Sequence, residues 1–311
     1  MIDFVIFIVS LGVLIWGSDL LVDQSEIIAK RFGISEYIIG ATLVALGTSL
    51  PEMAASITAS LDHKPELAVS NVIGSNIFNI TLVLSAVFII AKKVSPDRDF
   101  FAKDSSWALF PVLIFILMAL DGEFGRFDGL LLMFLMIGYI LFLLSTGNDI
   151  LIDDEASEES GEFSWVKAAG LSILGLVLVI VGADYAIDSA STIAKGLGVS
   201  EWIIGIVMIS LGTSLPELMV SVRAAIKGKA DMAIGAIIGS NMANTTVVLG
   251  SAALVGGIEI DPMKYSFDIA TMLVATLMLV FLSANKLYSK PAGISLLIVL
   301  GIFMQHTMSS I

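Results

Sequence analysis

Long stretches of this chain contain no aspartate, glutamate, lysine or arginine, and this feature limits its possible folds more than any other. Examples are residues 107–120, 129–148, 168–183, 232–258, 269–285 and 292–305. A helix that crosses a bilayer needs about 20 mostly apolar residues. Only 14% of the 311 residues are charged, whereas about 25% is usual in a soluble domain. We therefore predict an all-α membrane protein that crosses the lipid bilayer many times.

We predict ten transmembrane helices, which begin near residues 4, 37, 67, 105, 128, 166, 201, 231, 266 and 291. Between the fifth and the sixth, residues 148–165 carry seven acids and few apolar side chains. That composition is typical of a solvated linker. The predicted organisation is a five-helix repeat over 1–147, an acidic linker over 148–165, and a second five-helix repeat over 166–311.

The two halves of the chain share sequence at one constant offset. Leu46–Glu52 recurs as Leu211–Glu217, and Ile73–Asn76 recurs as Ile238–Asn241, in both cases 165 positions later. Gly17 has its counterpart at the same offset, in Gly182. One offset held without a gap through three spans indicates a duplication. The repeated motif regions are residues 40–80 and 205–245.

An odd number of spans in each repeat determines how the halves are oriented. The second repeat must enter the membrane from the opposite side, which gives two inverted-topology repeats, as in many secondary transporters. Loops after odd-numbered spans hold twelve lysines and arginines, and the opposite side holds four. Because basic residues favour the cytoplasm, we expect both termini outside the cell, the linker in the cytoplasm and the chain in the plasma membrane.

Glu52 and Glu217 are the residues that best indicate a function. Each follows an uncharged apolar run, Tyr37–Pro51 and Trp202–Pro216. An acid at the middle of a bilayer costs about 2.5–3.5 kcal/mol even on lenient insertion scales. No lysine, arginine or histidine lies at a matching depth in the predicted spans. The two carboxylates therefore predict a site for a cation taken from solution.

The surrounding residues supply further oxygen atoms. Pro51 and Pro216 lack an N–H, so their helices should kink or break, and carbonyls freed there, including those near Ala45, can turn towards a bound ion. The hydroxyl and amide side chains of the motifs are Thr48, Ser49, Ser75 and Asn79, with Thr213, Ser214, Ser240 and Asn244. Such hard oxygen ligands suit Ca²⁺, Na⁺ or Mg²⁺ and argue against zinc or copper. A kink with close helix packing is the alternative interpretation, but packing does not require an acid.

These motifs carry a family resemblance. Ala45–Glu52 (ALGTSLPE) and Ser210–Glu217 (SLGTSLPE), with Gly74–Asn79 (GSNIFN) and Gly239–Asn244 (GSNMAN), resemble the two alpha repeats of the calcium/cation antiporter superfamily. The branch they resemble is that of the sodium/calcium exchangers, and the resemblance covers nearly the whole chain. It implies a secondary active antiporter that exchanges Na⁺ for Ca²⁺ by alternating access, with net movement of charge and with spans 1 and 6 sliding past a fixed core.

The resemblance also implies roles for individual residues. Glu52 and Glu217 would share Ca²⁺, and Thr48 and Thr213 would support them through hydroxyl or backbone oxygens. Asn79 and Asn244 would line the middle of the site. Sodium sites would be completed by Ser49, Ser75, Ser214 and Ser240, together with the backbone of Ala45 and Ser210.

Two positions depart from the family pattern. Ser210 stands where an alanine is usual, which adds a hydroxyl that could alter selectivity. Asn244 stands where some relatives carry aspartate, so the pocket has two formal negative charges and a potassium requirement is less expected. Two carboxylates close together in a low dielectric resist joint ionisation, so we also expect protons to compete with the metal ions.

Several alternatives stay open at this stage. A proton/calcium antiporter is the nearest, although the chain lacks the acidic third-span motif typical of that branch, and a cation channel belongs to a different class. No HExxH, GxSxG or P-loop motif indicates an enzyme or an ATP-driven pump. Since the chain has no cysteine, thiolate metal sites and disulfides are excluded. We expect no cofactor, nucleic acid or protein partner, only the transported Ca²⁺ and Na⁺.

Overall fold

The structure, a computed structural model, describes residues 2–91, 94–146, 163–198 and 201–309, without the side chains of residues 201–211. Most of this chain is helical, because helices satisfy their own backbone hydrogen bonds where no water is available. The first half contains α1 (Ile2–Phe32), α2 (Glu36–Ile39), η1 (Gly40–Val44), α3 (Ala45–Thr48), α4 (Leu50–Leu61), α5 (Pro65–Phe78), η2 (Asn79–Val83), α6 (Leu84–Ile90), α7 (Phe100–Ala119), β1 (Glu123–Phe124) and α8 (Arg126–Thr146). The second half contains α9 (Trp165–Gly196), α10 (Glu201–Ile226), α11 (Ala230–Ala243), η4 (Asn244–Val248), α12 (Leu249–Gly256), β2 (Ile258–Glu259), α13 (Ser266–Ala284) and α14 (Lys290–Ser309).

The predicted span starts agree with the helices, since each falls within five residues of an observed helix start. Among the described residues, eight helices are long and apolar enough to cross a membrane, and a ninth is added if the bent pair Glu36–Thr48 and Leu50–Leu61 is one span. The chain is therefore a multi-pass, mostly helical membrane protein, while the count of ten spans stays a prediction. The acidic segment of the predicted linker lies largely outside the described residues.

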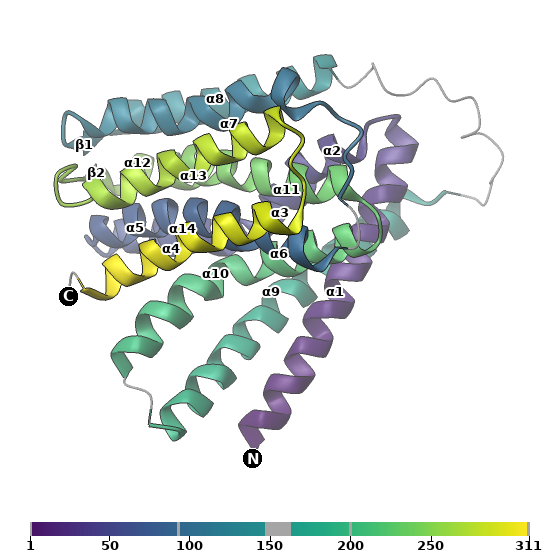
Figure 1. Ribbon diagram of the computed structural model, residues 1–311, viewed down its shortest axis with the longest axis horizontal. Coiled ribbons are helices and arrows are strands. Elements are labelled where there is room, and N and C mark those ends of the chain that lie inside the picture. Colours follow the sequence, from purple (N-terminus) through teal and green to yellow (C-terminus); the bar gives the residue numbers. More distant parts are fainter. Residues whose placement is uncertain (1, 92–93, 147–162, 199–200, 310–311) are drawn as a thin grey trace.

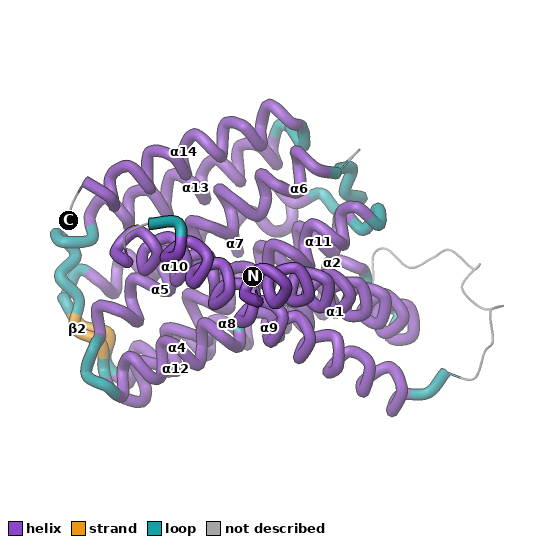
Figure 2. Tube along the Cα trace, turned by 90° about the horizontal axis from the view of Figure 1, so that it is seen from below, coloured by secondary structure: helices purple, strands orange, loops and turns teal. Residues whose placement is uncertain are grey.

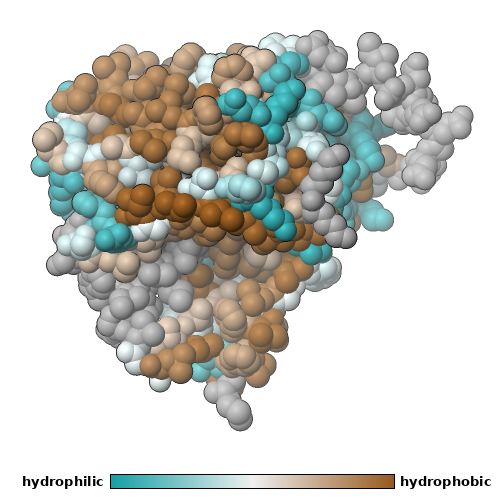
Figure 3. Space-filling view, in the orientation of Figure 1, coloured by the Kyte–Doolittle hydropathy of each residue, from teal (hydrophilic) through white to brown (hydrophobic). Residues whose placement is uncertain are grey.

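Two helical segments form the centre of the bundle. Of the most apolar window of Pro65–Ile90, 72% is buried, and for Ala230–Gly256 the value is 89%; in the other candidate spans it is 22–39%. Most outer helices run roughly parallel to one another, whereas α1, α9 and α10 cross them obliquely (Figure 1). The face seen in Figure 3 is largely apolar, with strongly polar side chains gathered mostly towards its left and right edges. This distribution suits a protein whose outer helices face lipid.

The long helices α1 and α9 lie side by side and antiparallel (Figures 1 and 2). Their contact depends on glycine: a Cβ atom on Gly17 would lie 2.7 Å from the Leu178 Cβ, and one on Gly182 would lie 2.9 Å from the Leu14 backbone nitrogen. Small residues allow the backbones of two membrane helices to approach closely. The contacts of Gly17 with Val179 and of Leu14 with Gly182 are related to each other by the offset of 165 residues.

A second set of glycines brings α2 and η1 against α11. Gly235 lies against the Tyr37 backbone, Gly40 against Met232, and Gly239 against Ala41. Near the opposite end of the bundle, β1 and β2 pair antiparallel, with Phe124 opposite Ile258. Both sets of contacts join the first half of the chain to the second.

Candidate cation site

The structure brings Glu52 and Glu217 together from the two halves of the chain. Glu52 lies in the first turn of α4 and Glu217 lies within α10. Their exposed fractions are only 1% and 3%, and the two carboxylates are close enough for electrostatic repulsion from Glu217 to act on Glu52. No group of three or more acidic or histidine side chains that could hold a metal ion occurs in the described part of the chain. Glu52 and Glu217 together contribute two formal negative charges.

The local sequence explains how Glu52 reaches this position. The helix is interrupted at Ser49, whose backbone leaves the helical range, and α4 restarts with Pro51 in its first turn. The two segments make an angle of 44°. Since proline has no N–H to donate, it fits the first turn of the new helix. We expected a kink or a break at both prolines; the first motif is broken, whereas α10 continues through Pro216 as one helix.

The hydroxyl groups of each motif lie beside the carboxylate of the other. The Ser49 Oγ donates a hydrogen bond of 3.2 Å to Glu217 Oε1, and the Thr48 hydroxyl also lies near Glu217. The Thr213 hydroxyl lies near Glu52. Thr48 and Thr213 each precede the glutamate of their own motif by four residues, and each hydroxyl lies near the glutamate of the other motif. This holds both for the interrupted first motif and for the continuous helix α10.

Many oxygen and nitrogen atoms at this position have no hydrogen-bond partner among the described residues. They are both carboxylate oxygens of Glu52, Oε2 of Glu217, the hydroxyls of Ser214 and Ser240, and the amide groups of Asn79 and Asn244. A buried polar group without a partner costs about 1–3 kcal/mol, and more when it is charged. A cluster of such oxygens is therefore stable only when a cation or water satisfies it.

Asn79 and Asn244 each stand at an irregular turn, where an α-helix passes into a π-helical turn. Asn79 begins the π-helical turn η2, and Asn244 begins the π-helical turn η4. Single π turns inside α-helices are frequent at functional sites. Ser75 and Ser240 lie one turn earlier on α5 and α11, and all four side chains are buried. The two π turns were not predicted, because nothing in the local composition distinguishes them from α-helix.

The two expected backbone ligands, Ala45 and Ser210, differ in what the structure shows of them. The Ala45 carbonyl accepts hydrogen bonds from the Ser49 N–H, at 3.0 Å, and from the Thr48 Oγ1, at 3.3 Å, so it is already engaged here. Ser210 belongs to the part of α10 whose side chains the structure does not describe, and the effect of its additional hydroxyl stays a prediction.

The ion pairs of the described residues include neither Glu52 nor Glu217. Asp19 on α1 instead pairs with Arg223, at 2.7 Å, and with Lys227, at 3.2 Å, near the end of α10. Its repeat counterpart Asp184 has no basic partner among the residues described. The two halves therefore differ in their ion pairs: Asp19 joins α1 to α10, and Asp184 on α9 makes no equivalent pair among the described residues.

Several buried polar contacts were not predicted from the sequence. Asn76 and Thr245 are hydrogen-bonded across the two halves, and the recurrence of Asn76 as Asn241 was the available signal. The buried ion pair of Arg98 with Asp104 was also missed. That pair joins a loop to α7, and no repeat or spacing in the sequence marks it.

Comparison with known proteins gives a consistent result. The family model described as sodium/calcium exchanger protein matches residues 2–145 and 167–308. The inner membrane protein YrbG of Escherichia coli is 33% identical over 95% of this chain and 93% of its own length. The sodium/calcium exchanger MaX1 of Methanosarcina acetivorans is 28% identical over 95% of each chain. A solved structure of the sodium-calcium exchanger NCX_Mj, soaked with Na⁺ and Sr²⁺, matches with a TM-score of 0.83, 33% identity and 97% coverage of both chains.

Proposed function

Because this chain belongs to the sodium/calcium exchanger family, we propose that it exchanges Na⁺ for Ca²⁺ at one pocket formed around Glu52 and Glu217. The activity is secondary antiport by alternating access and requires no cofactor. The observation that carries the proposal is the pair of buried carboxylates, 1% and 3% exposed, whose oxygens lack a basic partner among the described residues. Such a pair is stable in an apolar bundle when a cation neutralises it.

Each ligand has a proposed role. Glu52 and Glu217 bind Ca²⁺ directly, and Thr48 and Thr213 support the carboxylate of the opposite motif. Ser49, Ser75, Ser214 and Ser240 contribute hydroxyls to Na⁺ sites, together with the backbone oxygens of Ala45 and Ser210, and Asn79 and Asn244 line the centre. Six members of this set support the assignments, because they have polar atoms without a hydrogen-bond partner among the described residues: Glu52, Glu217, Asn79, Asn244, Ser214 and Ser240.

The architecture is proposed to be two inverted repeats of five spans. The antiparallel contact of α1 with α9 supports this proposal, because its residue pairs are related by the 165-residue offset. An inverted pair of repeats can exchange conformations and so open the site to one side of the membrane at a time. With both termini outside and the linker in the cytoplasm, as the basic residues indicate, the expected location is the plasma membrane.

Competition for the glutamates explains why the two ion fluxes are coupled. One Ca²⁺ or two Na⁺ balance two carboxylates, and any further Na⁺ makes the loaded pocket positive. Exchange then moves net charge across the membrane. One net charge corresponds to about 2.3 kcal/mol per 100 mV, which shifts the Ca²⁺ gradient at equilibrium about fiftyfold.

We expect purified protein in Na⁺-loaded liposomes to take up Ca²⁺ when the external medium contains no Na⁺. Uptake should be absent without the Na⁺ gradient and should change with an imposed membrane potential. A proton gradient alone should not drive it. Uptake driven by protons in the absence of Na⁺ would instead identify a proton/calcium antiporter, and a Ca²⁺ conductance without counter-ion would identify a channel.

Acid should inhibit Ca²⁺ transport between pH 8 and pH 6. Protonation removes the negative charge of a carboxylate that the cation requires, so the transport rate should fall as pH falls, by up to about tenfold per pH unit for one essential group. Because protons and Ca²⁺ compete, raising the Ca²⁺ concentration should restore the rate. A pH-independent rate, or a loss that excess Ca²⁺ does not relieve, would contradict this competition.

A further inference from the structure

Three side chains outside the proposed ligand set connect the inner helices of the two halves. The Asn76 Nδ2 on α5 donates a hydrogen bond of 2.8 Å to the Thr245 Oγ1 on η4. The Thr245 hydroxyl donates to the backbone carbonyl of Asn241, at 3.0 Å. The Asn241 Nδ2 donates to the backbone carbonyl of Asn76, at 3.4 Å. Asn76, Thr245 and Asn241 therefore form a closed cross-link between α5 and α11.

The position of this cross-link relates it to the cation site. Asn76 follows the proposed ligand Ser75 directly and precedes Asn79 by three residues. Asn241 has the same relation to Ser240 and Asn244. Because the residues of a helix move together, the separation of Asn76 from Asn241 helps to set the separation of the ligands on α5 and η2 from those on α11 and η4.

The cross-link is unequal in the two halves. Asn76 and Asn241 are counterparts at the offset of 165 residues, so a symmetric protein would use both amides in the same way. The counterpart of Thr245, however, is Ile80, which offers no hydroxyl to Asn241. The short bond to Thr245 Oγ1 is thus the stronger half of the link, and the contact of 3.4 Å is the weaker.

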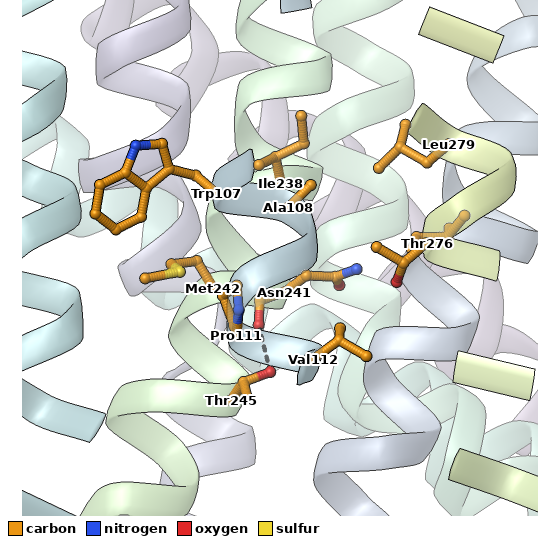
Figure 4. Close-up of a pocket in the computed structure, with 11 residues that line it drawn as sticks. Trp107, Ala108, Pro111, Val112, Ile238, Asn241, Met242, Thr245, Thr276 and Leu279 are labelled. Atoms are coloured by element: carbon orange, nitrogen blue, oxygen red, sulfur yellow. Dashed lines mark hydrogen bonds between the residues drawn. The ribbon is translucent and has the colours of Figure 1, made fainter. Parts of the chain in front are cut away.

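A small cavity of about 10 Å³ lies beside the cross-link. Trp107, Pro111, Asn241, Thr245 and Thr276 are among the residues that line it. Figure 4 shows Asn241 between Thr245 and Thr276, with the hydrogen bond from Thr245 to Asn241 drawn. Side chains do not fill this position completely, so the hydrogen bonds add to the packing that positions this part of α11.

We propose that Asn76, Thr245 and Asn241 are positioning residues that set the size of the cation accepted between the two halves. The proposal rests on the proposed exchange function and adds a determinant of ion selectivity to it. Loss of the cross-link lets the ligands of α5 and α11 separate. A wider site favours a larger divalent cation, so Sr²⁺ gains relative to Ca²⁺.

Thr245→Val tests the proposal, since valine keeps the shape of threonine and removes its hydroxyl. The matched control is Thr276→Val, because Thr276 lines the same cavity and its hydroxyl donates only within its own helix, to the Met272 carbonyl at 2.9 Å. Na⁺-driven uptake of Ca²⁺ and Sr²⁺ is measured in liposomes for each. We expect Thr245→Val to raise the ratio of Sr²⁺ to Ca²⁺ uptake several-fold, and Thr276→Val and Thr245→Ser to keep the wild-type ratio.

An unchanged ratio in Thr245→Val would overturn the proposal, as would an equal change in Thr276→Val. If Thr245→Val does not fold, Thr245→Ala removes the hydroxyl without added volume and is judged by the same ratio. The outcome is distinct from failure of the proposed function. If the wild-type protein shows no Na⁺-driven uptake, the exchange function fails; if it does and the ratio is unchanged, only the role of the cross-link fails.

Discussion

Replacement of Glu52 or Glu217 by glutamine is expected to abolish Na⁺-driven Ca²⁺ uptake. Either change keeps the size of the side chain and removes half of the formal charge of the pocket. Loss of one partner from a buried charge interaction costs about 3–5 kcal/mol, which corresponds to weakening of Ca²⁺ binding by more than about a hundredfold. The measurement is Ca²⁺ flux into Na⁺-loaded liposomes at fixed protein content.

Glu66→Gln is the matched control for this substitution. Glu66 is an exposed acid that pairs with Lys264 at 2.7 Å, with side chains 63% and 53% exposed, and exposed pairs contribute little. Its variant should transport Ca²⁺ at the wild-type rate. Transport by Glu52→Gln and Glu217→Gln at a rate near that of the control would contradict the assignment of the site.

Thermal unfolding gives a second measurement on the same proteins. Ca²⁺ bound by the folded state raises its stability, so Ca²⁺ should raise the unfolding temperature of the wild-type protein in detergent. The two glutamine variants should fold and lose this Ca²⁺-dependent increase. A variant that is already unfolded before heating, at every Ca²⁺ concentration, would show only that the substitution prevents folding. An unfolding temperature that still rises with Ca²⁺ would show that the glutamate is not a ligand.

Gly239→Ala is expected to destabilise the protein more than most single-methyl changes. A Cβ at Gly239 would lie 2.6 Å from the Ala41 Cα and 2.7 Å from the Ala41 carbonyl carbon, and a backbone in a packed helix cannot move aside as a side chain can. Overpacking of this kind costs about 1–3 kcal/mol or more. Alanine favours helix over glycine by about 1 kcal/mol, which only partly offsets that cost.

The control for the glycine prediction is Gly301→Ala. Gly301 lies in α14, and a Cβ atom added to it would meet no atom of another element within 4 Å in the part of the chain that the structure describes. This variant should unfold at or slightly above the wild-type temperature in detergent, and Gly239→Ala should unfold below it. Equal unfolding temperatures would show that α11 can move away from η1 at little cost.

Much of the architecture could be predicted because it depends on local composition. The runs around Leu132, Leu249 and Leu296 are apolar over a whole membrane thickness, and the bilayer then requires a helix whatever the neighbours are. The acids Glu52 and Glu217 could be found for the same reason, because their cost in an apolar run is apparent without any partner. Their membership of a cation site stays a prediction that the flux measurements test.

The partners of these residues could not be predicted from spacing. Thr48 lies four residues before Glu52, yet its hydroxyl lies near Glu217, because the two motifs pack against each other. The repeat gave equal expectations for Pro51 and Pro216, yet the helix is interrupted only before Pro51 and continues through Pro216.

The sequence by itself determined that this chain is a multi-pass membrane protein whose halves share motifs at one offset, each with an acid after an apolar run, since hydrophobicity, repetition and charge are properties of the residues alone. Only the tertiary structure decided that Ser49 reaches Glu217, that Asn76 reaches Thr245, and that Gly239 lies against the Ala41 backbone. Those contacts join residues far apart in the chain, and they depend on which helix faces pack together. Packing of that kind minimises the free energy of the whole bundle, so no short segment encodes it.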